Sequence, residues 1–170
     1  MIYLKPFDKT YFEVLKSWVG NADELLLFSG PTLFRFPLTD EQLDTYIADP
    51  ARRVYAVMDN YTNEPLGMGE IFRVDAETVR LCRILLGVKQ RRGGGIGRQI
   101  TQSLVDIAFS EPQIRQIELY VYDFNTPAIA CYGHCGFRID PDVAGPPSGR
   151  AGWNNLRMYL DRSGYTAPEK

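Results

Sequence analysis

The sequence lacks an excess of charge of either sign, since its 19 lysine and arginine residues nearly balance its 21 acidic residues. The resulting formal net charge of -2 argues against a general nucleic-acid binder. It has no run of about 18 apolar residues, the length at which a transmembrane helix is expected. The N-terminus also lacks the charged-then-apolar order of a signal peptide. We therefore expect a cytoplasmic protein that binds neither nucleic acid nor membranes.

Cysteine and histidine are scarce, with three cysteines and one histidine in the chain. An odd number of cysteines without a secretion signal predicts reduced thiols. Cys131, His134 and Cys135 fall on adjacent turns of one expected helix, but no fourth ligand is nearby and the usual spacing of zinc sites is missing. We therefore predict no metal site and a structural role for these three side chains.

Internal repeats, low-complexity tracts and linkers are absent as well. Hydrophobic residues make up 45% of the chain, which predicts a globular protein, and 170 residues suit one domain with a sizeable core. We predict a single domain over residues 1–170, with its core at about 2–160 and a loose C-terminal tail at 161–170.

Alternating apolar residues, helical spacing and turn residues predict both strands and helices. Strands are expected at residues 2–4, 54–58, 66–74, 79–87, 116–122, 137–139 and 153–160. Helices are expected at 9–19, 22–28, 40–48, 96–110 and 126–135. The short connections between the second, third and fourth strands indicate an antiparallel meander. The helix at 96–110 leaves room for the strands at 79–87 and 116–122 to pair in parallel.

The most informative stretch is the glycine-rich segment 88–97, which lies between the expected strand at 79–87 and a long helix. Glycine lets the backbone approach a ligand closely and adopt unusual dihedral angles. The first amides of a helix have no internal partner, and the helix dipole adds partial positive charge there. This arrangement predicts a binding site for a phosphate group.

Two common phosphate-binding loops do not fit this segment. A Walker loop needs lysine and then serine or threonine after its last glycine, but Gly97 is followed by Arg98. In a Rossmann fingerprint the third glycine would fall at Arg98 or at Ile100, and neither is glycine. The pattern that fits is Arg92-x-x-Gly95-x-Gly97.

A second pattern follows the strand at 116–122. Asn125 or Thr126 can cap a helix, and Pro127 suits the first helical position. The residues of this pattern, in chain order, are Asn125, Ala128, Tyr132, Gly136 and Phe137. Gly136 suits the C-terminal end of the helix.

Together, these two patterns resemble the GCN5-related N-acetyltransferase (GNAT) family, most clearly between residues 84 and 137. The resemblance implies an α/β (α+β) fold: a mixed sheet of about six to seven strands with a meander, one parallel pair and helices on both faces. It implies transfer of an acetyl group from acetyl-CoA to a primary amine of a small molecule or protein, without a metal. The alternative is a non-catalytic module that binds or senses acyl-CoA. A homodimer is common in the family.

The resemblance also assigns roles to residues. The pyrophosphate would be held by the glycine segment, comprising Arg92, Gly93, Gly94, Gly95, Ile96 and Gly97. Lys89 and Arg98 would add positive charge, because Gly94 stands where the family commonly has a basic residue. An amide of Leu85, Leu86 or Gly87 would stabilise the oxyanion. Asn125 and Ala128 would contact the cofactor, with Asn125 hydrogen-bonding the pantetheine arm or capping its helix, and Tyr132 would hydrogen-bond the leaving sulfur.

The general base is left open by the sequence, because the strand at 79–87 contains no carboxylate. Glu70 on the neighbouring strand is the first candidate and Asp123 the second, with deprotonation through water as the third possibility. Phe28, Phe34 and Phe36 either face the acceptor or belong to the core, and we favour the core.

Overall fold

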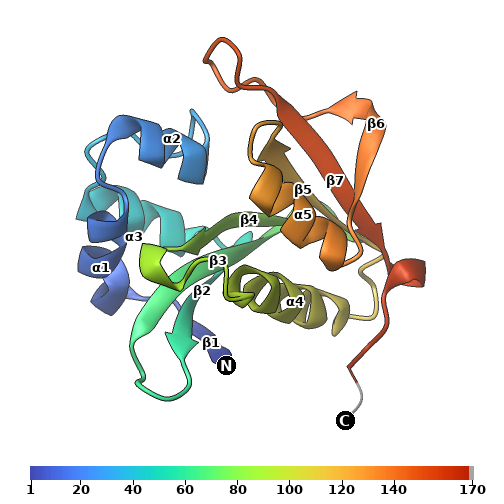
Figure 1. Cartoon of the computed structure of the whole chain (residues 1–170), viewed down its shortest axis with the longest axis horizontal. Coiled ribbons are helices and arrows are strands. Elements are labelled where there is room, and N and C mark those ends of the chain that lie inside the picture. Colours follow the sequence, from blue (N-terminus) through green and yellow to red (C-terminus); the bar gives the residue numbers. More distant parts are fainter. Residues whose placement is uncertain (169–170) are drawn as a thin grey trace.

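The computed structural model describes residues 1–168, and its seven strands form one sheet in the order β1-β2-β3-β4-β5-β7-β6 (Figure 1). The strands are β1 (Ile2–Pro6), β2 (Arg52–Asp59), β3 (Pro65–Arg73), β4 (Thr78–Leu86), β5 (Gln116–Tyr122), β6 (Arg138–Ala144) and β7 (Asn155–Asp161). β4 and β5 run parallel, and the other neighbours pair antiparallel. The predicted mixed sheet with a meander and one parallel pair is confirmed.

Helices cover both faces of this sheet (Figure 1). α1 (Phe12–Trp18), α2 (Ala22–Ser29) and α3 (Asp40–Ala48) contribute to one hydrophobic cluster. α4 (Ile96–Phe109) and α5 (Thr126–His134) pack on a second cluster, which includes Ile100 and Leu104. Because strand side chains alternate between faces, β2 sends Met58 into the first cluster and Val57 into the second. No helix within residues 1–168 is both long and apolar enough to cross a membrane.

Side-chain caps explain where several helices begin. Asn21 accepts a hydrogen bond from the Glu24 amide at the start of α2, and Thr39 accepts one from the Gln42 amide at the start of α3. Asn125 caps α5 in the same way. α4 differs, because its N-cap is Gly95, which has no side chain to accept a hydrogen bond. The first turn of α4 therefore keeps its amides available.

β4 contains a bulge and separates from β5 along part of its length. Met68 and Glu70 of β3 pair with Leu85 and Cys82, so that β4 has one extra residue between these pairs. Arg83 within this bulge has a φ of +48°, in the left-handed region that is uncommon for residues other than glycine. The pairing of β4 with β5 ends at Leu81 and Leu119. Beyond that point the two strands leave an opening in the sheet.

The C-terminal segment is more ordered than the sequence predicted. The Arg162 guanidinium donates to the backbone carbonyls of Ile114 and Glu111, each at 2.6 Å. The Tyr165 hydroxyl donates to Asp106 on α4 at 2.9 Å. Within the segment 161–170, which was predicted to be a loose tail, Arg162 and Tyr165 thus contact the rest of the domain, and 169–170 lie outside the described residues. β6 also extends to Ala144, although a loop was expected from 140 onward.

Candidate active site

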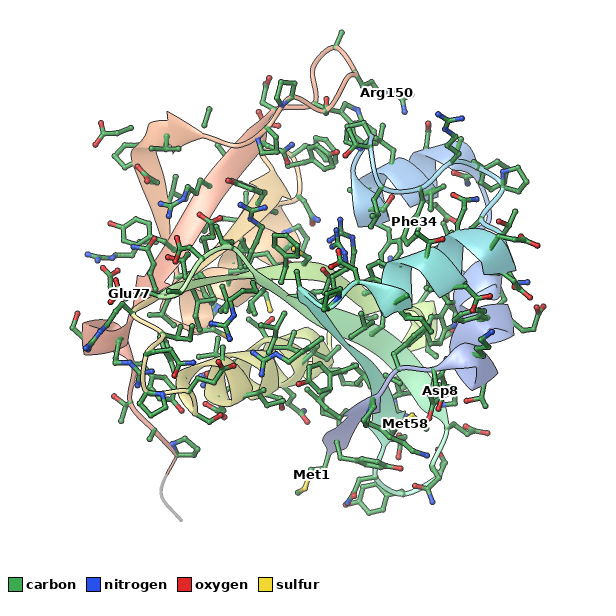
Figure 2. The ribbon with its side chains drawn as sticks, turned by 180° about the vertical axis from the view of Figure 1, so that it is seen from behind. Met1, Asp8, Phe34, Met58, Glu77 and Arg150 are labelled. Atoms are coloured by element: carbon green, nitrogen blue, oxygen red, sulfur yellow. The ribbon has the colours of Figure 1, made fainter. Side chains whose placement is uncertain are left out.

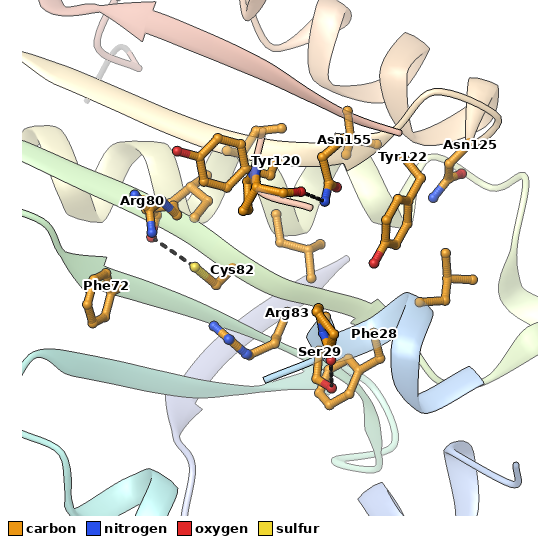
Figure 3. A pocket seen from close by; sticks show the side chains of 18 of the residues that line it. Phe28, Ser29, Phe72, Arg80, Cys82, Arg83, Tyr120, Tyr122, Asn125 and Asn155 are labelled. Atoms are coloured by element: carbon orange, nitrogen blue, oxygen red, sulfur yellow. Dashed lines mark hydrogen bonds between the residues drawn. The ribbon is translucent and has the colours of Figure 1, made fainter. Parts of the chain in front are cut away.

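A cavity of about 400 Å³ lies where β4 and β5 separate (Figure 3). Residues 80–84 and 119–122 line it from these two strands, and residues 27–32 at the end of α2 form one wall. Pro146 and Pro147 of the loop between β6 and β7 line another side. Arg150 of that loop donates to Asp23, so the loop reaches α2 (Figure 2). Asn125 and Tyr132, both predicted site residues, line the cavity.

The glycine segment forms an anion-binding site between β4 and α4. Gly93 and Gly95 have φ of +83° and +76°, which explains why glycine occupies both positions. None of the amides from residues 93–98 donates to an acceptor within residues 1–168. A Cβ added at Gly93 or Gly95 would meet nothing within 4 Å, so the loop is open to a ligand. Unpaired amides at a helix N-terminus fit a diphosphate group.

The basic residues around this loop differ in their partners. Lys89 pairs with Glu24 at 2.8 Å and Arg91 pairs with Asp59 at 2.8 Å. Arg92 donates weakly to the Leu86 carbonyl at 3.4 Å. Within residues 1–168, Arg98 has no carboxylate partner. Arg92 and Arg98 are therefore better placed than Lys89 to contact an anion.

The three candidate oxyanion donors at the end of β4 are not equivalent. The Gly87 amide already donates to the Leu66 carbonyl at 2.9 Å, so it does not suit the predicted role. A Cβ at Gly87 would lie 2.0 Å from Trp18, which shows that glycine is needed there for packing. Leu85 and Leu86 remain as candidates, and they pair with Met68 and Gly67 of β3.

Tyr132 is held in the cavity by α5, whose start is fixed by the Asn125 cap. Its ring packs edge-to-face against Phe137. Its hydroxyl makes no hydrogen bond to any residue within 1–168, and burial raises the pKa of this phenol well above its ordinary value. The group therefore stays protonated at neutral pH and is available as a hydrogen-bond donor.

Glu70 does not occupy the position expected of a general base. Its side chain is 0% exposed and does not line the cavity. Arg52 donates to one carboxylate oxygen at 2.6 Å, and Arg83 donates to the other at 3.1 Å. The Tyr46 hydroxyl also donates to the oxygen that Arg83 contacts. Because both oxygens are engaged away from the cavity, this geometry does not suit the predicted role of base.

No other carboxylate replaces Glu70 in the cavity. Asp123 accepts a hydrogen bond from Asn154 at 3.1 Å and lies outside the cavity lining. Within residues 1–168, no aspartate or glutamate lines the cavity. Of the residues considered as bases, none therefore lies next to the space where an acceptor would bind.

The three phenylalanines have different positions. Phe34 is 5% exposed and lies between α2 and α3, where it contacts Tyr46 edge-to-face (Figure 2). Phe36 is 47% exposed and does not line the cavity. Phe28 lines the cavity and stacks on Phe34. The prediction that these phenylalanines belong to the core therefore describes Phe34, whereas Phe28 lines the cavity in which an acceptor would bind.

Sequence reasoning missed three arginines that line the cavity, namely Arg52, Arg80 and Arg83. The alternation of Arg80, Cys82 and Ile84 along β4 is a signal that could have placed Arg80 on the cavity side. Arg83 could not have been found in this way. Strict alternation would place it on the side away from the cavity, but the bulge turns it to the same side as Arg80 and Cys82.

The cysteines do not provide reactive or metal-binding groups in this site. Burial raises the pKa of the Cys82 thiol to about 12, so it is not a thiolate at neutral pH. Within the described part of the chain, no three His, Cys, Asp or Glu side chains cluster so that they could hold a metal ion.

An anion-binding loop beside a cavity with a tyrosine donor, on a mixed sheet opened at its parallel pair, suits an acyltransferase that uses a coenzyme A thioester. A model of the acetyltransferase (GNAT) family matches residues 22–137, which is more than half of the sequence. The chain therefore belongs to the acetyltransferase (GNAT) family. The predicted class, an acetyl-CoA-dependent N-acetyltransferase, is confirmed.

Similar proteins agree with this membership. Aminoglycoside N(6')-acetyltransferases type 1 from Klebsiella pneumoniae and Serratia marcescens are each 24% identical over 165 residues, covering 88% of this chain and 80% of theirs. A spermidine N-acetyltransferase from Vibrio cholerae, solved with CoA and spermine, superposes with a TM-score of 0.79 at 19% identity, covering 96% of both chains. An aminoglycoside acetyltransferase solved with coenzyme A and kanamycin superposes with a TM-score of 0.74 at 19% identity, covering 96% of both chains. These proteins are N-acetyltransferases, which favours an enzyme over the non-catalytic module.

Proposed function

We propose that this enzyme transfers the acetyl group of acetyl-CoA to a primary amine of a small molecule. The observation that carries this proposal is the set of unpaired amides at 93–98, which lie in the connection and first turn between the cavity-lining strand β4 and α4. The aminoglycoside and spermidine N-acetyltransferases that the chain resembles support a small-molecule acceptor. Two further proposals concern the acceptor and the assembly. Acetylation of a peptide amine can be tested by a thiol-release assay with peptide acceptors, and a homodimer can be tested by sedimentation measurements.

The binding roles follow from groups that lack partners. The amides of 93–98, with Arg92 and Arg98 nearby, would hold the diphosphate. The Asn125 side chain lines the cavity and could hydrogen-bond the pantetheine arm while capping α5. An amide of Leu85 or Leu86 would stabilise the oxyanion. A thioester is already activated toward amines, so the protein mainly positions the reactants.

Tyr132 would assist the departure of the sulfur by donating a hydrogen bond. A phenol has an ordinary pKa near 10 and a thiol near 8.5, so full proton transfer to the thiolate is already unfavourable by roughly 1.5 units. Burial raises the pKa of Tyr132 further, which makes full transfer less favourable. A hydrogen bond that strengthens as charge develops on sulfur does not require this transfer.

The acceptor amine must lose its proton without a carboxylate in the cavity. Arg52, Arg80 and Arg83 line the cavity, and nearby positive charge lowers the pKa of an ammonium group. The neutral amine that attacks the thioester is therefore favoured by the cavity itself. Water can then carry the proton to solvent.

A thiol-release assay with a panel of primary amines tests the proposal, combined with calorimetry of acetyl-CoA binding. We expect acetyl-CoA to bind in the absence of an acceptor and at least one small amine to release free CoA. Binding without release on any amine would support the non-catalytic module, and absence of binding would contradict the assignment of the glycine segment.

A further inference from the structure

The charged side chains that line the cavity all carry positive charge. Arg52 comes from β2, and Arg80 and Arg83 come from β4. Their side chains are 15%, 27% and 13% exposed, so each is largely buried. No aspartate or glutamate in the described part of the chain lines the same space.

The carboxylates that pair with these arginines lie outside the cavity lining, and one of them, Asp49, contacts Arg52 at 2.9 Å with a side chain that is 36% exposed. Glu70, with a side chain 0% exposed, pairs with Arg52 and Arg83. Glu118, with a side chain 7% exposed, pairs with Arg80 at 2.6 Å and also with Arg157 at 2.8 Å. A ligand in the cavity therefore meets the guanidinium groups, while the opposite charges lie behind them.

Aromatic rings hold the arginines in place. Arg52 lies 4.8 Å from the Phe72 ring centre, Arg80 lies 4.7 Å from that of Tyr120, and Arg83 lies 5.9 Å from that of Tyr46. Figure 3 shows Phe72 and Arg80 at the end of the cavity away from Tyr122 and Asn125. Arg80 is thus separated from the end assigned to the pantetheine arm, and Arg83 lies between the two ends.

Arg83 has additional features that fit binding rather than packing alone. Its backbone has a φ of +48°, in the left-handed region. Residues other than glycine adopt this conformation at a cost in free energy, and such residues cluster at active sites and ligand-binding sites. The Nη2 of Arg83 makes no hydrogen bond within residues 1–168 and, unlike the buried Nε, is accessible to a ligand. A guanidinium with an unpaired donor beside a cavity matches the geometry of a carboxylate or phosphate.

We propose that the acceptor is a primary amine that also carries a negatively charged group, and that Arg83 and Arg80 are specificity-determining residues that bind this group. This inference rests on the proposed acetyltransferase function. A polyamine or an aminoglycoside would meet three guanidinium groups, and no carboxylate in the described part of the chain lines the cavity to bind its positive charges, so both are disfavoured. An anionic group is bound by the guanidinium groups, while the same charges favour the neutral form of the reacting amine.

Matched pairs of acceptors test the inference, because the members of a pair differ only in the anion. We would measure kcat/KM for β-alanine against β-alaninamide and for O-phosphoethanolamine against ethanolamine, with spermidine and kanamycin as polycations. We expect the anionic member of at least one pair to be preferred about 10-fold or more, as for a charge-assisted hydrogen bond. The pair that responds distinguishes carboxylate from phosphate.

Variants locate the discrimination. Arg83→Gln and Arg80→Gln should each reduce the preference for the anionic acceptor about 10-fold, measured as the ratio of kcat/KM values within a pair, so that any effect of the lost charge on deprotonation of the amine is shared by both members and cancels. The control is Arg53→Gln, since Arg53 neighbours Arg52 on β2 but pairs with Glu111 and does not line the cavity. Using two arginines keeps the test decisive if one variant fails to fold. Calorimetry with N-acetyl-β-alanine and its amide, in the presence of CoA, measures the same preference without turnover.

The outcomes separate the two proposals. If neutral or polycationic amines react and no anionic amine is preferred, the inference is wrong and the acetyltransferase function stands. If the preference survives in both arginine variants, the arginines only balance Glu70 and Glu118, and the assignment to Arg83 and Arg80 is wrong. If no amine releases CoA and acetyl-CoA does not bind, both proposals fail.

Discussion

At the scale of single residues, Tyr132 is the side chain proposed to assist the chemical step, and its replacement by phenylalanine removes one hydroxyl group. We expect Tyr132→Phe to lower kcat roughly 10- to 100-fold, the effect of losing a hydrogen bond to a charged group. Binding of acetyl-CoA should change less than twofold, because the diphosphate is assigned to the glycine segment. Steady-state kinetics and calorimetry measure the two quantities separately. Equal losses in both would indicate that the hydroxyl matters for packing on α5.

Glu70 illustrates how burial changes the meaning of a carboxylate. Glu70→Gln removes the charge shared by Arg52 and Arg83, and breaking a buried ion pair typically costs about 3 kcal/mol or more in the free energy of unfolding. We expect urea unfolding to show a loss of this size, while the pH profile of kcat/KM keeps its shape. The control is Asp123→Asn, at the other candidate base, which should change neither quantity much. Loss of one ionisation from the acidic limb of the profile in Glu70→Gln would restore Glu70 as the base.

At the scale of elements, the sequence predicted the strands, helices and caps that depend on residues close together in the chain. The strand, glycine segment and helix at 79–110 follow from apolar spacing and glycine content, and the caps at Thr39 and Asn125 follow from residue type. The position of Arg83 depends on the register between β3 and β4, which no local pattern shows. The burial of Glu70 similarly depends on two arginines brought together from β2 and β4. The strand of the candidate base Glu70 was therefore predicted, whereas its burial was not.

The N-terminus of α4 provides a test in which shape and charge can be separated. Gly95→Asp places a carboxylate next to the unpaired amides, and Gly95→Asn places a neutral side chain of nearly the same shape there. Both variants strain a backbone with a φ of +76°, so this cost cancels in the comparison. We expect the aspartate variant to bind acetyl-CoA at least about 10-fold more weakly than the asparagine variant, from repulsion between like charges a few ångströms apart.

Calorimetry at low and high salt completes this comparison. The difference between the two variants should shrink as salt increases, because exposed charges are screened. Equal affinities of the two variants at low salt would contradict the assignment of the diphosphate to residues 93–98.

At the scale of the whole molecule, the sheet connects the two hydrophobic clusters. Ala56 and Met58 of β2 belong to the cluster under α1–α3, whereas Val57 belongs to the cluster under α4. On β3, Met68 and Ile71 are divided between the clusters in the same way. Neither cluster can lose its packing without exposing strands that the other cluster needs. This arrangement supports the prediction of a single domain.

We therefore expect one cooperative unfolding transition. The Trp153→Phe variant leaves Trp18 as its tryptophan, and Trp18 packs on the α1–α3 cluster. Its fluorescence and the far-ultraviolet circular dichroism, which reports all helices, should give the same urea midpoint. Acetyl-CoA at about 100 times its Kd should raise the free energy of unfolding by about 2.7 kcal/mol. Both probes should shift together, although Trp18 packs on the α1–α3 cluster and α4, which follows the glycine segment, packs on the other cluster. A ligand-induced shift in only one probe would show that the two faces unfold as separate units.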